Sequence, residues 1–122
     1  MSSLARLQNQ RAEPRIRVRW HAEVFIEGQG VHRGFIKEIS MSGTGFFLQK
    51  NVPMTKSIRL RIYMPPFTSS SVPYTMDVNA KVLHTVLDSE ESLFRTGVIF
   101  SQFIVPGDKR LLQKYIELLP CY

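Results

Sequence analysis

Hydrophobic and polar residues alternate in several segments of this 122-residue chain, most clearly over residues 16–26. Apolar side chains take every second position there: Ile16, Val18, Trp20, Ala22, Val24 and Ile26. The positions between them are occupied by Arg17, Arg19, His21, Glu23 and Phe25. Because successive side chains of a β-strand point to opposite faces, this pattern predicts a strand with one buried face. It also places Trp20 in the core.

Further strands follow, separated by residues that favour turns. The predicted strands cover residues 31–41, 45–49, 58–64, 74–87 and 93–100. Gly28-Gln29-Gly30 predicts a hairpin turn after the first strand, and the stretch from Pro65 to Pro73 predicts an exposed loop. Several strands joined by short turns indicate an antiparallel barrel or a strongly curved sheet.

The end of the chain changes to the 3.6-residue period of a helix. After Gly107, Asp108 is placed to cap a helix over residues 108–119, and Pro120 ends it. The apolar stripe of this helix consists of Leu111, Leu112, Tyr115, Ile116 and Leu119. Such a short helix is marginally stable alone, so its stripe must cover something. We expect it to close an open end of the barrel; packing on a partner is the alternative.

The segment from Lys37 to Phe47 begins as a strand and is then interrupted. Strict alternation puts Glu38 and Ser40 on one face with Ile36. Two glycines at the break, Gly43 and Gly45, predict either a turn with positive φ or a surface that another molecule approaches closely. The simpler alternative is a strand–turn–strand corner with a polar outer face.

Composition narrows the class of protein. The chain is 43% hydrophobic and 21% charged, which is typical of one folded domain. It has no apolar run long enough to span a bilayer and no signal-peptide core, so we expect a cytoplasmic protein. The single cysteine, Cys121, excludes a disulfide framework and a thiolate metal cluster.

The charge points to an anionic partner. The net charge is +6, and residues 1–20 contain five arginines against one acid, Glu13. Arginine, with its planar fork, suits phosphate or a purine edge better than lysine does. A solvated basic tail is the alternative.

Enzyme chemistry finds little support in the sequence. The three histidines, His21, His32 and His84, lack a paired metal-ligand spacing, so we expect no metal site. Ser40 and Ser42 lack the glycine–serine–glycine elbow of hydrolases, and there is no Gly-Lys-Ser/Thr phosphate loop. We therefore predict that the protein is not an enzyme and has no cofactor.

Two motifs resemble those of the PilZ domain family. The first is Arg11-x-x-x-Arg15, just ahead of the first predicted strand, and the second is Glu38-x-Ser40-x-x-Gly43 at a strand end. The resemblance covers residues 10–119. It implies a mainly β fold, a six-stranded antiparallel barrel with one C-terminal α-helix. We assign residues 11–122 to this domain and expect residues 1–10 to form a flexible tail.

The family's best-known members are bacterial receptors for cyclic di-GMP. The resemblance therefore implies this ligand, bound by Arg11, Arg15, Glu38, Ser40 and Gly43, with Gln10 and Arg17 as possible additional contacts. An arginine fork matches both the phosphates and the guanine edges of such a ligand. The implied process is control of motility, type IV pili or biofilm through an unidentified downstream protein. The mechanism that we expect is ordering of residues 8–16 by the ligand.

This sequence departs from the family pattern at two positions. Glu38 stands where the family has Asp or Asn, and a misplaced bidentate contact costs about 1–3 kcal/mol. Gln10 stands where many members have a further arginine. Two alternatives remain open: a PilZ-like adaptor that binds protein and no nucleotide, and a basic barrel that binds RNA or single-stranded DNA. Nucleic acid is less favoured, because the alternation directs Trp20 into the core.

Overall fold

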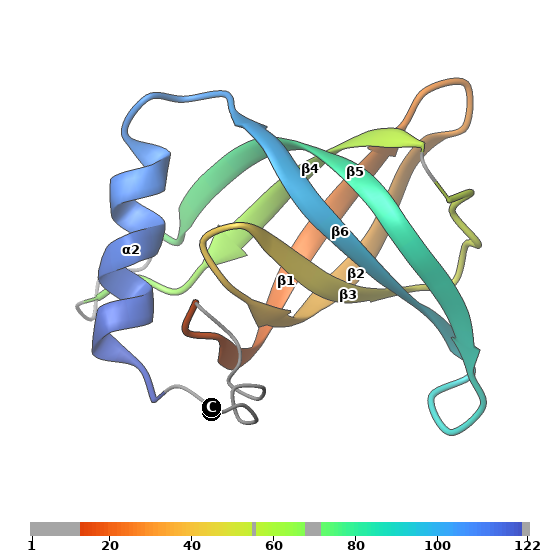
Figure 1. Ribbon diagram of the computed structural model, residues 1–122, viewed down its shortest axis with the longest axis horizontal. Helices are drawn as coiled ribbons and strands as arrows, with labels where there is room; N and C mark the ends of the chain where they lie inside the picture. Colours follow the sequence, from red (N-terminus) through yellow and green to blue (C-terminus); the bar gives the residue numbers. More distant parts are fainter. Residues whose placement is uncertain (1–12, 55, 68–71, 121–122) are drawn as a thin grey trace, which may run out of the picture.

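The alternating segments form the strands of a barrel (Figure 1). The structure is a computed structural model, and it describes residues 13–54, 56–67 and 72–120. Within these ranges the elements are β1 (Ile16–Ile26), β2 (Gly30–Ile39), β3 (Gly43–Leu48), β4 (Ser57–Met64), β5 (Tyr74–Asp88), β6 (Leu93–Phe103) and α2 (Asp108–Leu118). The predicted strands and the helix are confirmed. The last strand is three residues longer than the sequence pattern indicated.

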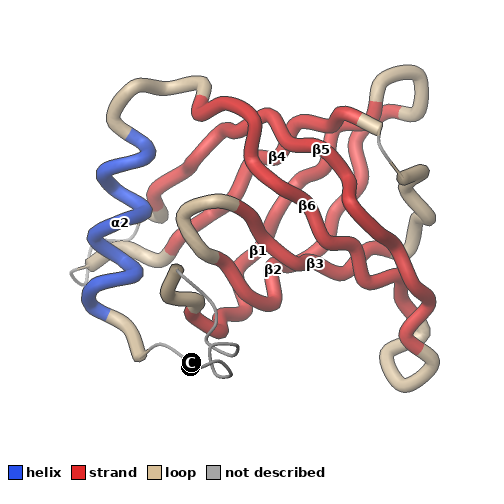
Figure 2. The backbone as a smooth tube through the Cα atoms, in the orientation of Figure 1, coloured by secondary structure: helices blue, strands red, loops and turns tan. Residues whose placement is uncertain are grey.

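The strands form a closed antiparallel barrel in the order β1-β2-β3-β6-β5-β4 (Figure 2). Most pairs of neighbouring strands in the barrel are also consecutive in the chain and form hairpins. Two pairings join strands that are distant in the chain, β1 with β4 and β3 with β6. The second of these sets Gly45 opposite Gly97. It therefore brings the interrupted segment of the sequence against the last strand.

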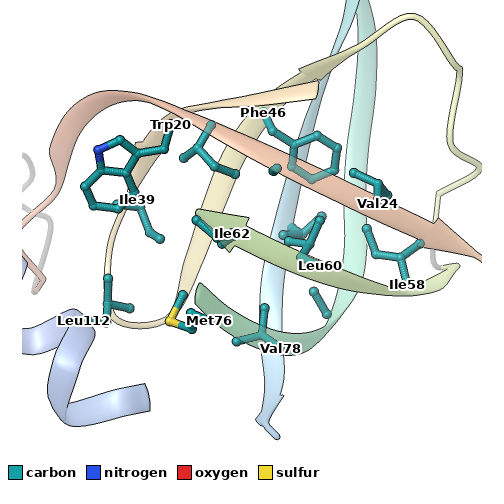
Figure 3. Close-up of a cluster of buried hydrophobic side chains, with 14 of the residues drawn as sticks. Trp20, Val24, Ile39, Phe46, Ile58, Leu60, Ile62, Met76, Val78 and Leu112 are labelled. Atoms are coloured by element: carbon teal, nitrogen blue, oxygen red, sulfur yellow. The ribbon is translucent and has the colours of Figure 1, made fainter. Parts of the chain in front are cut away.

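The inward faces of the strands form one hydrophobic core. Trp20 and Val24 of β1 are buried with Leu60 and Ile62 of β4 and with Met76 of β5 (Figure 3). Trp20 is only 7% exposed, as the alternation predicted. Because each strand contributes every second side chain to this core, the other half of its residues faces outward.

Helix α2 lies across one end of the barrel (Figure 1). Its side chains Leu112, Tyr115 and Ile116 belong to the same core cluster as the strands. The ring of Tyr115 meets that of Trp20 edge-on, with centroids 5.3 Å apart, and its hydroxyl donates a hydrogen bond to the carbonyl of Pro65. The expected closure of the barrel end by the helix is confirmed.

Two details at the ends of this helix differ from the prediction. The N-cap is Gly107, with no side-chain cap, and Asp108 is the first helical residue. The Asp108 carboxylate instead accepts a 3.3 Å hydrogen bond from the backbone N–H of Asp77, which ties the helix to β5. Burial raises the pKa of Asp108 above its usual range. At the other end Leu119 is the C-cap and is 37% exposed, so it does not extend the buried stripe.

The predicted faces around Glu38 are wrong. A β-bulge shifts the β2–β3 register between Ile36 and Glu38. As a result Ile36 and Ile39 are both buried although they are three residues apart, and Lys37 between them is exposed. Glu38 therefore does not share the face of Ile36. Bulges break the two-residue period in this way because one strand contains an extra residue opposite its partner.

Candidate ligand-binding site

A cavity of about 350 Å³ is lined by residues of β2, β3, β5 and β6, together with Arg15 just ahead of β1. We call it the outer cavity. Exposed side chains such as Lys37, His84 and Arg95 line it, which places it on the outside of the barrel wall. Its volume is within the range of about 300–1,000 Å³ that is typical of small-molecule sites.

Two glycines form the floor of the outer cavity. In the barrel register Glu38 of β2 pairs with Gly45 of β3, Gly45 pairs with Gly97 of β6, and Gly97 pairs with His84 of β5. The four residues thus make a row across four strands, and all of them line the cavity. The two middle members have no side chain, so the side chains at the ends of the row lie close to them: Glu38 beside Gly45 and His84 beside Gly97.

The wall on the β2 side contains an ion pair. Nη1 of Arg15 lies 3.8 Å from Oε2 of Glu38, and the two side chains are 43% and 30% exposed. The hydroxyl of Thr44 donates a 2.6 Å hydrogen bond to the backbone carbonyl of Glu38, which ties β3 to β2 at this point. Both charged groups therefore lie at the surface of the cavity and remain accessible to a ligand.

Ser40 is part of the corner between β2 and β3. Its backbone N–H donates to the carbonyl of Gly43 at 2.9 Å, and its hydroxyl accepts a 3.3 Å hydrogen bond from the N–H of Ser42. The side chain is nearly buried, with 7% of the residue exposed. Ser40 lines the outer cavity and also holds the corner that shapes it.

The glycines at the break do not form a positive-φ turn. Gly43 and Gly45 lie inside β3, and the described glycines with positive φ are Gly28 and Gly30, in the β1–β2 hairpin. The reason for a glycine at position 43 is close approach of another strand: a Cβ there would lie 2.3 Å from the carbonyl oxygen of Val98. The neighbour that requires this glycine is β6, a segment of the same chain.

The opposite wall was not predicted from the sequence. It comprises Arg95 and Gly97 of β6 with Leu83 and His84 of β5. A glycine inside the last predicted strand was the available signal, because glycine in a strand interior often marks a close approach. Nothing in the local sequence, however, indicated that β6 would pair with β3 and bring these residues to the motif.

The structure brings together four of the residues predicted for the site. Arg15, Glu38, Ser40 and Gly43 all line the outer cavity. Arg17 pairs with Glu38 in the β1–β2 register and is absent from the described lining of the cavity. Gln10 and Arg11 lie outside the described residues, as do most of the residues 8–16 that we expected the ligand to order.

Two side chains in the described part of the N-terminal arm have polar partners on the barrel. The hydroxyl of Ser42 donates a 2.6 Å hydrogen bond to the carboxylate of Glu13, and Arg15 pairs with Glu38. Ordering of residues 8–16 by the ligand stays a prediction, and for residues 13–15 it would have to replace or keep these contacts. The corner between β2 and β3 provides polar partners for both side chains.

Other site types find no support in the described ranges. Among residues 13–54, 56–67 and 72–120, no three His, Cys, Asp or Glu side chains gather as metal ligands would; Cys121 lies outside these ranges. The described helix is too short and too polar to cross a membrane. The half-buried aromatic Phe35 is covered by the guanidinium of Arg19, 4.0 Å from its ring centroid, and by Phe47 at 5.1 Å. This packing leaves that ring poorly placed to stack on a nucleic-acid base.

Comparison with known families matches this chain to the PilZ domain over residues 9–118. Three similar solved structures are the inhibitor of motility MotI/DgrA of Bacillus subtilis, the PilZ domain of YcgR from Escherichia coli with c-di-GMP, and the MrkH–c-di-GMP complex of K. pneumonia. Their TM-scores are 0.72, 0.64 and 0.62, and their sequence identities are 19%, 17% and 18%. No curated protein matches the sequence.

These structures cover most of this chain, at 87%, 90% and 87%. Conversely, the chain spans 91% of the YcgR domain but only 49% of MotI and 49% of MrkH. At such low identities the likeness concerns the fold. It confirms the six-stranded antiparallel barrel with a C-terminal helix.

Proposed function

The chain belongs to the PilZ domain family, and we propose that its outer cavity binds cyclic di-GMP. The observation that carries this proposal is the convergence of Arg15, Glu38, Ser40 and Gly43 on one cavity, although Arg15 and the stretch 38–43 are distant in the chain. Two of the similar structures, the YcgR domain and MrkH, contain c-di-GMP. The bound c-di-GMP in these two similar structures supports the proposal that this protein binds the same class of ligand.

The chemistry of the cavity suits such a ligand. Cyclic di-GMP has two phosphates, which attract guanidinium groups, and guanine edges, which offer N–H donors to a carboxylate. In the proposed complex Arg15 binds a phosphate or a guanine edge, Glu38 accepts from guanine N–H groups, and Gly45 leaves room for the ligand above the sheet. Arg11 completes the arginine pair.

Binding has to compete with contacts inside the protein. The guanidinium of Arg15 already has the Glu38 carboxylate as a partner at 3.8 Å. An exposed ion pair of this kind contributes about 0–1 kcal/mol, so a doubly charged ligand can displace or share it at little cost. We propose that the exchange moves the N-terminal arm, including Arg11, and that a downstream protein in motility, pilus or biofilm control recognises the new surface.

Calorimetric titration with cyclic di-GMP tests the ligand. We expect the parent protein to bind it in preference to GTP and to a single-stranded oligonucleotide. Arg15→Ala should weaken binding by about 1.5–3 kcal/mol, because a charge-assisted contact is lost. Arg110→Ala is the matched control, because it removes the same charge from an exposed position on α2.

The possible outcomes separate the classes of function. Full affinity in Arg15→Ala would place the ligand elsewhere. No binding by the parent would favour the adaptor that acts through protein contacts alone, and tighter binding of the oligonucleotide would favour the nucleic-acid alternative. Hydrogen exchange with and without ligand tests the movement of the arm, and equal protection in both states would refute it.

A further inference from the structure

The second wall of the outer cavity contains a cation that belongs to neither PilZ motif. Arg95 lies two residues before Gly97 on β6, so both face the outside of the barrel. Its side chain is exposed and lines the same cavity as Arg15. Arg15 contacts Glu38 at the β2 end of the row, whereas Arg95 lies on β6, two residues from Gly97, and pairs with Val86 of β5.

The ring of His84 packs against the backbone of Gly97, which lies two residues from Arg95 on β6. A Cβ at position 97 would lie 2.4 Å from Nε2 and 2.5 Å from Cε1 of that ring. The third-nearest atom, Cδ2 at 3.2 Å, also belongs to the His84 side chain. The imidazole therefore rests directly on the strand backbone, in the space where any other residue would have its Cβ.

We propose that Arg95 binds a phosphate of the ligand across the cavity from Arg15, and that Gly97 sets the width of the cavity by seating His84. This inference rests on the proposed binding of cyclic di-GMP and extends the site beyond the two motifs. Arg15 is the one cation among the described motif residues, whereas a ligand with two phosphates offers a second anionic group that another guanidinium can bind. Gly97 acts through His84, so it is a positioning residue and makes no ligand contact of its own.

The contribution of Arg95 is tested by calorimetry on the full chain. We expect Arg95→Ala to weaken cyclic di-GMP binding by about 10- to 100-fold, as for loss of a charge-assisted contact. Arg110→Ala, with the same loss of charge on α2, should bind like the parent. If the parent protein and Arg95→Ala bind cyclic di-GMP equally well, this inference is overturned and the proposed function remains intact. A parent that does not bind would overturn both.

The role of Gly97 is tested by loss and rescue. In Gly97→Ala the added methyl group lifts the imidazole off the floor and into the cavity. We expect about a tenfold loss of affinity, as for overfilling a packed space. Removing the ring as well, in the Gly97→Ala/His84→Ala double variant, should restore binding to within about threefold of the His84→Ala protein.

The control variant is Gly107→Ala, because a Cβ there has open space around it. All variants should keep the circular dichroism spectrum of the parent, since the ring of His84 can move without moving backbone. Unchanged affinity in Gly97→Ala would refute the seating role. Equal weakness of the single and double variants would also refute it, because the loss would then come from the strand and not from the ring.

Discussion

The barrel end under α2 and the outer cavity are built in opposite ways. At the end, large side chains fill the space: Trp20, Leu112 and Tyr115 are all buried. At the cavity, Gly45 and Gly97 have no side chain, and the side chains of Glu38 and His84 lie next to their backbone. The first region stabilises the fold, whereas the second exposes backbone and charged side chains at the surface.

The comparison shows where a small barrel can place a site without losing its core. The interior of the barrel is filled by side chains, so the cavity had to form on the outside of the wall. Outward-facing positions tolerate glycine because they contribute little to the buried core. The two regions should therefore respond to mutation independently, apart from residues such as Gly43 that serve both packing and site.

The largest expected effect is on stability and comes from the closed end. Leu112 is fully buried at 0% exposure, so Leu112→Ala should lower the free energy of unfolding by about 2–5 kcal/mol. Urea denaturation measures this loss. Exposed Gln113→Ala on the same helix is the control and should change stability little. Loss of ligand affinity in folded Leu112→Ala would contradict the independence of the two regions.

The next-largest effect is a loss of stability in a Gly43 variant. It tests whether position 43 needs a glycine for strand packing or for the approach of a ligand. A methyl group there meets the carbonyl of Val98 at 2.3 Å, so Gly43→Ala should cost about 1–3 kcal/mol of stability, as overpacking does. Thermal and urea unfolding both report it, with Gly107→Ala as the control. If the variant is as stable as the parent and only binding is weakened, Gly43 serves the ligand and not the strand pairing.

Tyr115 offers a pH-dependent test of the closed end. Burial raises the pKa of Tyr115 to about 12. Since the folded-state pKa exceeds the ordinary value of about 10, the stability linked to this hydroxyl is fully present below pH 10. It is lost as the pH rises through the folded-state value.

Tyr115→Phe should remove this part of the alkaline loss. It should also cost about 0.5–1.5 kcal/mol at neutral pH, because the hydrogen bond to the Pro65 carbonyl disappears. Melting temperatures of parent and variant between pH 8 and about 12 measure both effects. Parallel curves over the whole range would show that the Tyr115 hydroxyl is not coupled to folding.

The smallest expected effect sharpens the view of the cavity. Glu38→Asp shortens the side chain, which loosens its contact with Arg15 and restores the reach of the family's Asp. Because an exposed ion pair contributes only about 0–1 kcal/mol, ligand affinity should rise by up to about fivefold. Calorimetry measures the change, and Glu90→Asp in the exposed β5–β6 turn is the control. Weaker binding would mean that the longer Glu38 is adapted to its own contact.

Local pattern was a good guide wherever one face of an element is buried. The strand over residues 16–26 and the helix near the C-terminus were predicted within a residue, because burial imposes a period that can be counted along the chain. The pattern failed at the bulge beside Glu38, where an extra residue changes the face. It also failed at Asp108, because the carboxylate bonds to Asp77, which is distant in sequence.

The sequence by itself determined the strands, the helix and the two motifs, since these depend on side-chain period and on short spacings. It predicted one wall of the outer cavity, with Arg15, Glu38, Ser40 and Gly43 at hand. Only the tertiary structure decided that β6 closes the barrel against β3 and adds Arg95, Gly97 and His84. Pairing between distant strands depends on the packing of the whole barrel, and no local run of residues encodes it.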